Sequence, residues 1–379
     1  MIEVGKIRLK ILFGITKKIK TVFCMMLGVA VIAIIFYLGG LMIIMSPGKI
    51  NQFTDENGQE INNSLAEKCF VEINGTRMGM IIRSKDISNP VLLFVHGGPG
   101  MPEYFLIEKY PTGLEDNFTV VYWDQRGAGL SYSTDIDKST ITIEQYIEDT
   151  IAVTNYLRER FKQDKIYLMA HSWGSYFSIQ AVQKVPQFYH AYIGIGQVTY
   201  QEESEKLAYQ YMLDYYTKAN DDKTLKVLKE NPQQSNGYKK IRDDVMHRSG
   251  IGSTHDMKSV VTGIFFASLK NKEYTFTEKI NLWRGKILLN KNVHLSMKDD
   301  LREKVTTLDV PTYFFSGVYD YTVNYKMSEE YLVQLEAPVK GFYLFEYSAH
   351  SPIFEEPKKV TQIIESDILL KTNTLANTK

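Results

Sequence analysis

The sequence predicts an α/β fold in which a mostly parallel, eight-stranded sheet carries helices on both faces. Two observations support this prediction. Short uninterrupted apolar runs, such as Val91–Val95 and Ile166–Met169, end directly in turns rich in small residues, and such runs are typical of strands buried in a parallel sheet. An amphipathic helical pattern over residues 142–161 stands between two of these runs, as a crossover between parallel strands requires.

The predicted elements follow one another from residue 69. Residues 69–73 and 77–83, joined by Asn74-Gly75, predict an antiparallel hairpin with a two-residue turn. A capping-box pattern, Thr142 with Gln145, begins the helix over 142–161. The remaining strands are predicted at 90–95, 118–123, 166–169, 192–196, 311–315 and 341–345, and a second helix at 173–185.

The junction between the fifth strand and the helix that follows it is the first candidate functional feature. Ala170-His171-Ser172-Trp173-Gly174 has the pattern small-x-Ser-x-Gly, which is typical of a tight strand-to-helix turn that presents a nucleophilic serine above the sheet. Ala170 stands where glycine is more usual, whereas Gly174 is in place. Ser172 is therefore the candidate nucleophile.

Two glycine-rich turns are predicted at the same edge of the sheet. The first, His96–Gly100, leaves the backbone bare, so that its amide groups can approach a substrate oxygen. In an acyl-transfer enzyme one oxyanion-hole donor belongs there and the other follows the nucleophile, which by position gives the N–H groups of Gly98 and Trp173. The second turn contains Asp124 and Arg126, for which we expect a structural ion pair rather than a catalytic role.

A nucleophilic serine requires a base and an acid that orients this base. Among the histidines after Ser172, only His350 stands in a loop just past a strong strand, 341–345. Asp320 follows the strand 311–315, at the carboxyl end where the chemistry of open α/β sheets is concentrated. Asp309 precedes that strand and is placed at the opposite edge. The predicted triad is Ser172, Asp320 and His350.

Taken together, these motifs resemble those of the proline iminopeptidase branch of the α/β-hydrolase superfamily. The resemblance covers about 300 residues, from Cys69 to the region of Ile364, and rests on His-Gly-Gly-Pro-Gly at 96–100, Asp-Gln-Arg-Gly-x-Gly-x-Ser at 124–131, Ser-Trp-Gly-Ser at 172–175, Gly-x-x-Asp at 317–320 and His-Ser at 350–351. It implies the α/β-hydrolase fold and an aminopeptidase activity. Ala170-His171 departs from the Gly-Gly usual in the family.

Strand–helix alternation stops between residues 200 and 307, and this segment is predicted to be a helical lid inserted between the sixth and seventh strands. Its aromatic residues either line a substrate pocket or pack the core of the lid: Tyr209, Tyr211, Tyr215, Tyr216, Phe265, Phe266 and Trp283. The resemblance implies lid glutamates that hold the free amino group of a substrate. Glu202, Glu203 and Glu205 are the nearest candidates, although acidic residues there also suit the start of a helix.

The N-terminal region predicts a membrane anchor. Residues 22–45 contain no charged residue and are long enough to span a bilayer, while residues 1–20 have a net charge of +5. By the positive-inside rule, residues 1–21 form a cytoplasmic tail and the rest lies outside the cell membrane. The expected domains are this tail, the transmembrane helix 22–45, a stalk 46–67, a core formed by 68–199 and 308–379, and the lid 200–307.

Composition limits the remaining possibilities. The 44 Lys and Arg residues balance the 44 Asp and Glu residues, so the sequence gives no support for nucleic-acid binding. Cys24 lies inside the predicted span, which leaves Cys69 without an internal disulfide partner. An exported, disulfide-free chain richer in Lys than in Arg favours a bacterial cell surface. We expect no metal and no cofactor, because no ligand spacing or phosphate-loop pattern is present.

The expected function is that of a membrane-anchored serine hydrolase outside the cytoplasm. Its substrate is a small peptide, from which an aminopeptidase removes the N-terminal residue, or alternatively an ester or lactone. A hydrolase scaffold that serves as a non-catalytic surface binding protein is a more remote alternative. A lid carboxylate within reach of the Ser172 pocket would favour the peptidase, because a desolvated ammonium group needs a paired carboxylate. A purely apolar pocket would favour the esterase. The sequence does not indicate an oligomeric state.

Overall fold

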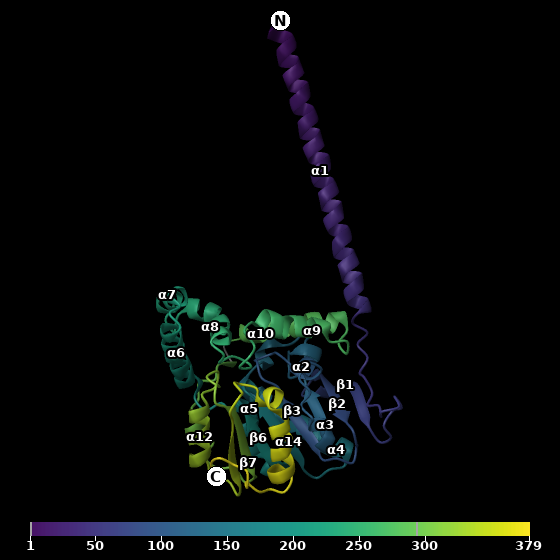
Figure 1. Cartoon of the computed structure of the whole chain (residues 1–379). Coiled ribbons are helices and arrows are strands. Elements are labelled where there is room, and N and C mark those ends of the chain that lie inside the picture. Colours follow the sequence, from purple (N-terminus) through teal and green to yellow (C-terminus); the bar gives the residue numbers. More distant parts are fainter. Residues whose placement is uncertain (1, 293–294) are drawn as a thin grey trace. The chain divides into compact units, whose positions relative to one another are not determined.

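The computed structural model describes residues 2–292 and 295–379 and divides the chain into two units, which are described separately. The smaller unit extends to Lys49 and includes Lys272–Phe276. It contains the long helix α1 (Ile2–Ile44), drawn in purple in Figure 1. Within α1, the segment Lys20–Ile44 has a mean hydropathy of 2.7 and is long and apolar enough to cross a membrane.

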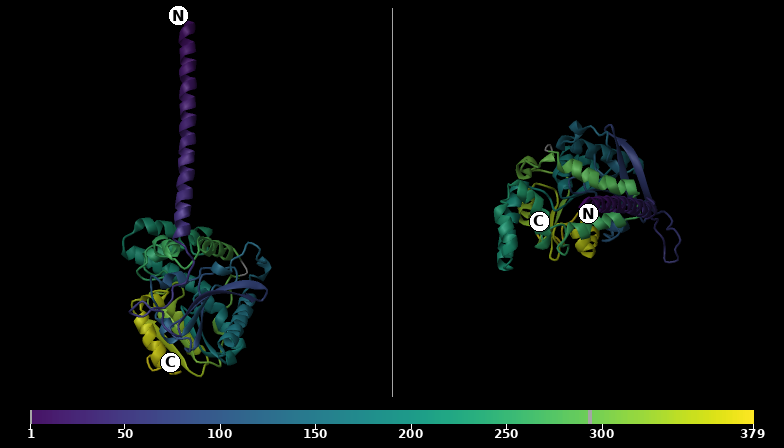
Figure 2. Two further views of the ribbon diagram at one scale, coloured as in Figure 1. Left: turned by 90° about the vertical axis from the view of Figure 1, so that its right-hand side faces the viewer. Right: turned by 90° about the horizontal axis from the view of Figure 1, so that it is seen from above.

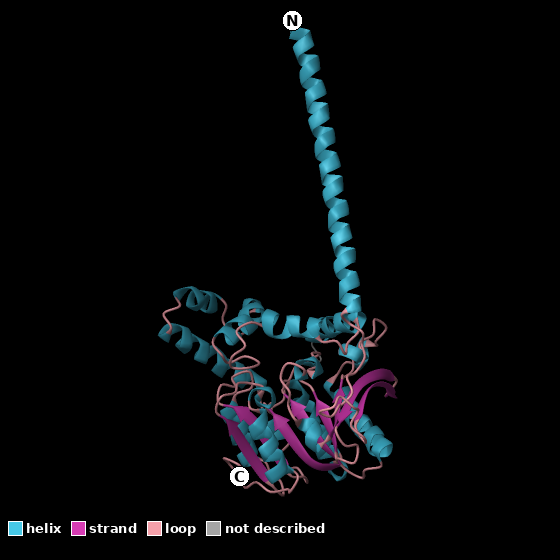
Figure 3. Ribbon diagram, turned by 45° about the vertical axis from the view of Figure 1, so that its right-hand side comes forward, coloured by secondary structure: helices cyan, strands magenta, loops and turns pink. Residues whose placement is uncertain are grey.

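The larger unit is built on one sheet of eight strands, shown in magenta in Figure 3. Their spatial order is β1-β2-β4-β3-β5-β6-β7-β8, and only the pairings of β2 with β1 and with β4 are antiparallel. The prediction of a mostly parallel eight-stranded sheet is therefore confirmed. The strands are β1 (Leu65–Ile73), β2 (Thr76–Ser84), β3 (Val91–Val95), β4 (Thr119–Trp123), β5 (Ile166–His171), β6 (Tyr189–Ile195), β7 (Thr312–Gly317) and β8 (Lys340–Phe345).

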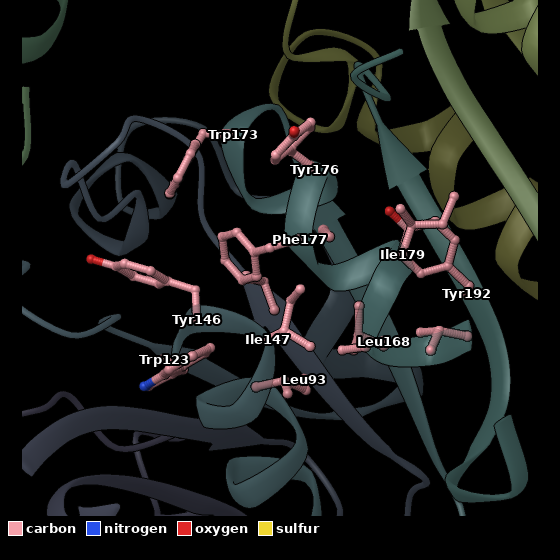
Figure 4. Packing of buried hydrophobic residues seen from close by; sticks show 14 of the residues in the cluster. Leu93, Trp123, Tyr146, Ile147, Leu168, Trp173, Tyr176, Phe177, Ile179 and Tyr192 are labelled. Carbon is pink, nitrogen blue, oxygen red and sulfur yellow. The ribbon is translucent and has the colours of Figure 1, made fainter. Parts of the chain in front are cut away.

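The interior strands β3 to β7 are buried along almost their whole length because helices cover both faces of the sheet (Figures 1 and 3). Figure 4 shows how α4 (Ile143–Phe161) and α5 (Trp173–Lys184) pack onto it: Ile147 and Phe177 lie over Leu93 and Leu168, with Trp123 at one side. The predicted cap of α4 is confirmed, since Thr142 Oγ1 accepts a hydrogen bond from Gln145 N at 3.2 Å.

Short helices complete the core around these elements. They are α2 (Tyr104–Ile107), α3 (Leu114–Asn117), η1 (Gly129–Ser131), η2 (Lys138–Thr140), η3 (Pro186–Phe188), α12 (Tyr325–Gln334), α13 (Pro352–Glu355), α14 (Pro357–Ile363) and η6 (Ile364–Ile368). The inserted lid contributes α6 (Gln201–Lys218), α7 (Asp222–Glu230), α8 (Asn236–Arg248), η4 (Val261–Phe265), α9 (Phe266–Lys270), α10 (Phe276–Asn290) and α11 (Leu301–Lys304). Figures 1 and 2 show α6–α10 gathered at one end of the sheet.

The segment 46–67, which the sequence predicts to be a stalk, is not a free linker along most of its length. From Ile50 onward the chain belongs to the larger unit, and Ile50 is buried. Gln52 Nε2 donates to Ala66 O at 3.0 Å, and β1 begins at Leu65. The polar composition of this stretch suggested an isolated linker, but its few apolar side chains and backbone pairings attach it to the sheet.

Candidate active site

The candidate nucleophile lies in a strained turn between β5 and α5. Ser172 has φ 52° and ψ −124°, a backbone conformation that L-residues rarely adopt. Its N–H donates to Ile195 O at 2.8 Å, and Ser175 Oγ donates to its carbonyl oxygen at 2.6 Å. A Cβ at Gly174 would lie 2.6 Å from His96 O, so only glycine fits there. This turn is the strand-to-helix junction that the small-x-Ser-x-Gly pattern predicts.

The structure brings the three residues of the predicted triad to the same end of the sheet. His350 Nδ1 lies 2.9 Å from Asp320 Oδ2, and both side chains are buried. Asp320 Oδ1 accepts the N–H of Val323 at 2.9 Å, which orients the carboxylate. His350 Nε2 is buried and has no hydrogen-bond partner among the described residues. His350 and Ser172 line one pocket, whereas Asp309 is exposed before the start of β7.

The two predicted oxyanion donors lie on neighbouring loops. Gly98 has φ 128°, which favours glycine, and it lines the pocket. Trp173 is the first residue of α5, so its N–H has no partner within the helix. Gln125 joins the two loops: Trp173 Nε1 donates to Gln125 Oε1 at 3.1 Å, and Gln125 Nε2 donates to His96 O at 2.7 Å.

His96 belongs to the same network as Gln125. Its Nδ1 lies 2.7 Å from Gly97 O, while its Nε2 accepts the N–H of Gln125 at 3.3 Å. These partners fit a neutral ring with hydrogen on Nδ1. Burial agrees with this assignment, because it lowers the pKa of His96 to about 4. The glycine-rich loop is therefore held by an uncharged, fully bonded histidine.

The expected ion pair between Asp124 and Arg126 is wrong. Arg126 instead forms a buried, bidentate pair with Asp149 of α4, with Nε–Oδ2 and Nη2–Oδ1 distances of 2.7 and 2.8 Å. Asp124 accepts the N–H of Leu130 at 2.7 Å, and burial raises its pKa to about 8. Proximity in sequence misled the prediction, because the arginine extends away from its own turn toward a carboxylate 23 residues later.

A second acid–histidine pair lies beside the nucleophile. His171 Nδ1 is 2.7 Å from Glu103 Oε1, and His171 Nε2 is 2.9 Å from the backbone oxygen of His350. Burial by itself lowers the pKa of His171, but the Glu103 carboxylate outweighs this and the pKa lies above 6.5. Burial raises the pKa of Glu103, but the charge of His171 brings it below 4.5. Both ring nitrogens thus face acceptors, which assigns His171 as an imidazolium.

The pocket above Ser172 has a volume of about 180 Å³. The core contributes Glu103 and Phe105 to its wall, and the lid contributes Asp243, Met246 and Lys286. Polar groups therefore stand among apolar ones, as is typical of a ligand site. Among the described residues, no group of three or more His, Cys, Asp or Glu side chains is arranged to hold a metal ion.

The lid glutamates are not part of this pocket in the described structure. Each has a cationic partner: Glu202 pairs with Lys206 at 3.0 Å and Glu203 with Arg302 at 3.0 Å. The two carboxylate oxygens of Glu205 accept hydrogen bonds from Arg242 Nε, at 2.9 Å for Oε1 and 2.8 Å for Oε2. The seven lid aromatics are likewise absent from the described lining, and Tyr209, Tyr211 and Tyr216 belong to the core of the lid.

Comparison with known proteins identifies the family. A model of the α/β hydrolase fold matches residues 90–243. The probable aminopeptidase YbaC of Bacillus subtilis is 35% identical over 309 residues, which are 78% of this chain and 93% of that protein. The chain belongs to the α/β-hydrolase family.

The chain is also similar to proteins named proline iminopeptidase. The proline iminopeptidase of Saccharolobus solfataricus is 27% identical over 324 residues, with 83% of this chain and 96% of that protein covered. The crystal structure of the proline iminopeptidase of Mycobacterium smegmatis covers 80% of this chain and 98% of its own, with a TM-score of 0.57. At 12% identity, that likeness concerns the fold alone.

Sequence reasoning did not identify Glu103, Gln125 or Asp243 as parts of the site. Gln125 lies within a motif of the resemblance, between the charged residues Asp124 and Arg126, and no sequence signal separates it from them. In the sequence, His171 stands out only as a departure from the family pattern. That departure was the available signal for Glu103, because a histidine placed beside a nucleophile in a buried turn needs a polar partner.

Proposed function

We propose that this α/β hydrolase is a membrane-anchored serine aminopeptidase that removes the N-terminal residue from small peptides, with proline as one candidate for that residue. Ser172 Oγ attacks the acyl carbon, and His350 Nε2 takes its proton and returns it to the leaving amine. Asp320 holds the imidazole and stabilises its charged form. The N–H groups of Gly98 and Trp173 receive the developing negative charge on the substrate oxygen.

The free nitrogen of His350 carries this proposal. Since Nδ1 donates to Asp320 Oδ2, the other nitrogen, Nε2, is the acceptor, and it is buried without a partner among the described residues. Such an unbonded buried atom requires an explanation. A general base that faces a pocket shared with a serine in a strained turn supplies one.

The pocket supports a small substrate with a charged group. A volume of about 180 Å³ is below the ~300 Å³ at which ligand pockets usually begin. The space therefore suits one small residue at the N-terminus of a peptide rather than a folded chain. Glu103 and Asp243 line it, and a carboxylate is the group that a peptide's ammonium end needs. An esterase or lactonase with an apolar acyl group has no use for these charges.

The anchor is proposed from α1. Lys20–Ile44 could cross the bilayer once, and the basic residues before it favour a cytoplasmic N-terminus with the hydrolase domain outside. The hydrolase would then act on peptides outside the cytoplasm.

A paired assay tests the substrate class. Purified full-length protein is given prolyl and other aminoacyl 4-nitroanilides beside short-chain 4-nitrophenyl esters. The aminopeptidase proposal expects turnover of at least one aminoacyl nitroanilide. Ester turnover without any nitroanilide turnover would discard the aminopeptidase and retain the serine hydrolase.

A further inference from the structure

We propose that Glu103 binds the free α-ammonium group of the substrate through its second carboxylate oxygen, while His171 holds the first. The inference rests on the proposed aminopeptidase function and names the residue that gives this function its substrate class. It places the amino-group site on the core, in the loop after His96–Gly100, and not on the glutamates of the lid.

Covalent geometry limits where such a site can be. The amino nitrogen of an N-terminal residue is two bonds from the acyl carbon, which places the two atoms about 2.5 Å apart. Because Ser172 must attack that carbon, the carboxylate that holds the ammonium group has to lie in the pocket of Ser172 itself. Two carboxylates line this pocket within the described part of the chain, Glu103 and Asp243.

Glu103 is close to the nucleophile. A Cβ at Gly97 would be 2.9 Å from Glu103 Oε1 and 3.1 Å from Ser172 Cβ, so both atoms lie about 3 Å from the same point. The bare backbone of Gly97 separates them. An ammonium group beside Glu103 would therefore be within one residue's reach of Ser172.

Glu103 also has an unused acceptor. Its Oε1 accepts from His171 Nδ1 at 2.7 Å and from Gly97 N at 3.0 Å. Its Oε2 is buried and has no partner among the residues that the structure describes. An ionised carboxylate with an oxygen left unbonded in a dry site is costly, and an ammonium group carries three donors that can satisfy it.

The other carboxylates are less suited to this role. Asp243 is 61% exposed at its side chain and already accepts Arg242 Nη1 at 3.0 Å. A solvated, paired carboxylate offers little energy to an incoming cation. Glu205 has the same arginine as its partner, and Glu202 and Glu203 are paired outside the pocket.

His171 explains why the carboxylate remains in place before substrate arrives. Glu103 is held against the nucleophile turn by one charged hydrogen bond, so the site does not need to be assembled on binding. His171 in turn donates to the backbone oxygen of His350 at 2.9 Å, which connects the amino-group site with the loop of the candidate base. We regard His171 as a positioning residue.

The test compares substrates with and without an amino group. Full-length protein is assayed with alanyl 4-nitroanilide and with propanoyl 4-nitrophenyl ester, whose acyl group lacks only the amine. The readout is the ratio of the two kcat/KM values. For Glu103→Gln we expect this ratio to fall about 30-fold or more, chiefly through KM, which corresponds to about 2 kcal/mol. Glu202→Gln is the matched control, because Glu202 lies outside the pocket and pairs with Lys206, and it keeps the wild-type ratio.

Each contrary result has its own meaning. If Glu103→Gln lowers kcat/KM equally for both substrates, Glu103 has only a structural role and the inference fails. If Asp243→Asn lowers the ratio instead, the lid holds the amino group and the inference again fails. A wild-type protein that cleaves the ester but no aminoacyl nitroanilide overturns the proposed function itself. Should Glu103→Gln not fold, the double variant E103Q/H171N removes both charges of the pair and has the same expected ratio.

Discussion

His350 Nδ1 and Asp320 Oδ2 lie 2.9 Å apart at the ends of two adjacent parallel strands, β8 and β7. The approach is possible because Gly196 lies against the ring: a Cβ there would be 2.7 Å from His350 Cε1. This contact fixes hydrogen on Nδ1 and leaves Nε2 as the acceptor.

Replacing Asp320 with asparagine should therefore leave the fold intact but favour the wrong tautomer of His350. We expect kcat for an aminoacyl nitroanilide to fall about 10⁴-fold, the size seen for this change in a Ser-His-Asp triad. Asp309→Asn, exposed before β7, is the control and should retain wild-type kcat. Equal kcat values for the two variants would remove Asp320 from the mechanism.

The buried pair of Arg126 and Asp149 provides a stability prediction. Asp149→Asn leaves the guanidinium buried without a counter-charge, and we expect the free energy of unfolding to drop by about 3–5 kcal/mol. The neighbouring Glu148→Gln breaks an exposed pair with Lys184, with side chains 54% and 52% exposed, and should cost about 0–1 kcal/mol. Denaturant unfolding of the domain measures both. Similar losses in the two variants would contradict the account of this turn.

The Glu103–His171 pair should make stability depend on pH. Glu103 has a lowered pKa, so its contribution is lost as pH falls below 4.5 through the folded value. His171 has a raised pKa, so its contribution is complete below 6.5 and is lost as pH rises through the folded value. The difference in Tm between wild type and His171→Asn should be largest between pH 4.5 and 6.5. A difference that grows steadily up to pH 9 would reverse the sign we assign.

The topology of the anchor is open to a direct test. Protease added to intact cells should digest or release the hydrolase domain, because Lys20–Ile44 is proposed to leave it outside the cytoplasm. A cytoplasmic marker protein serves as the control for cell integrity. Full protection of the domain until the cells are lysed would place it inside.

Much of the fold could be predicted because its signals are local. Apolar runs in the sequence indicate the buried strands, and the turn at Ser172 depends on residues within a few positions of it. Chain order then placed Asp320 and His350 at the end of the sheet where Ser172 stands. The Asn74-Gly75 turn of the hairpin and the cap at Thr142 are equally local, and the structure reproduces both.

The remainder depends on contacts between residues distant in sequence. No residue near Glu103 in the sequence predicts its contact with His171, because the two side chains meet only when the loop after β3 folds over the end of β5. Arg126 likewise takes its partner from α4 rather than from its own turn. The lid was predicted as helical, but which of its side chains reach the pocket depends on how each helix is rotated about its axis. For that reason Asp243, and not Glu202, Glu203 or Glu205, lines the pocket.

The identity of the nucleophile is the central claim, and turnover by Ser172→Ala tests it most directly. With an aminoacyl 4-nitroanilide as substrate, we expect kcat to fall about 10⁶-fold if the triad acts as a unit. A fluorophosphonate probe should label the wild-type protein at Ser172 and leave the variant unlabelled. Full turnover by Ser172→Ala, or a wild-type protein that neither turns over substrate nor takes the label, would contradict the account.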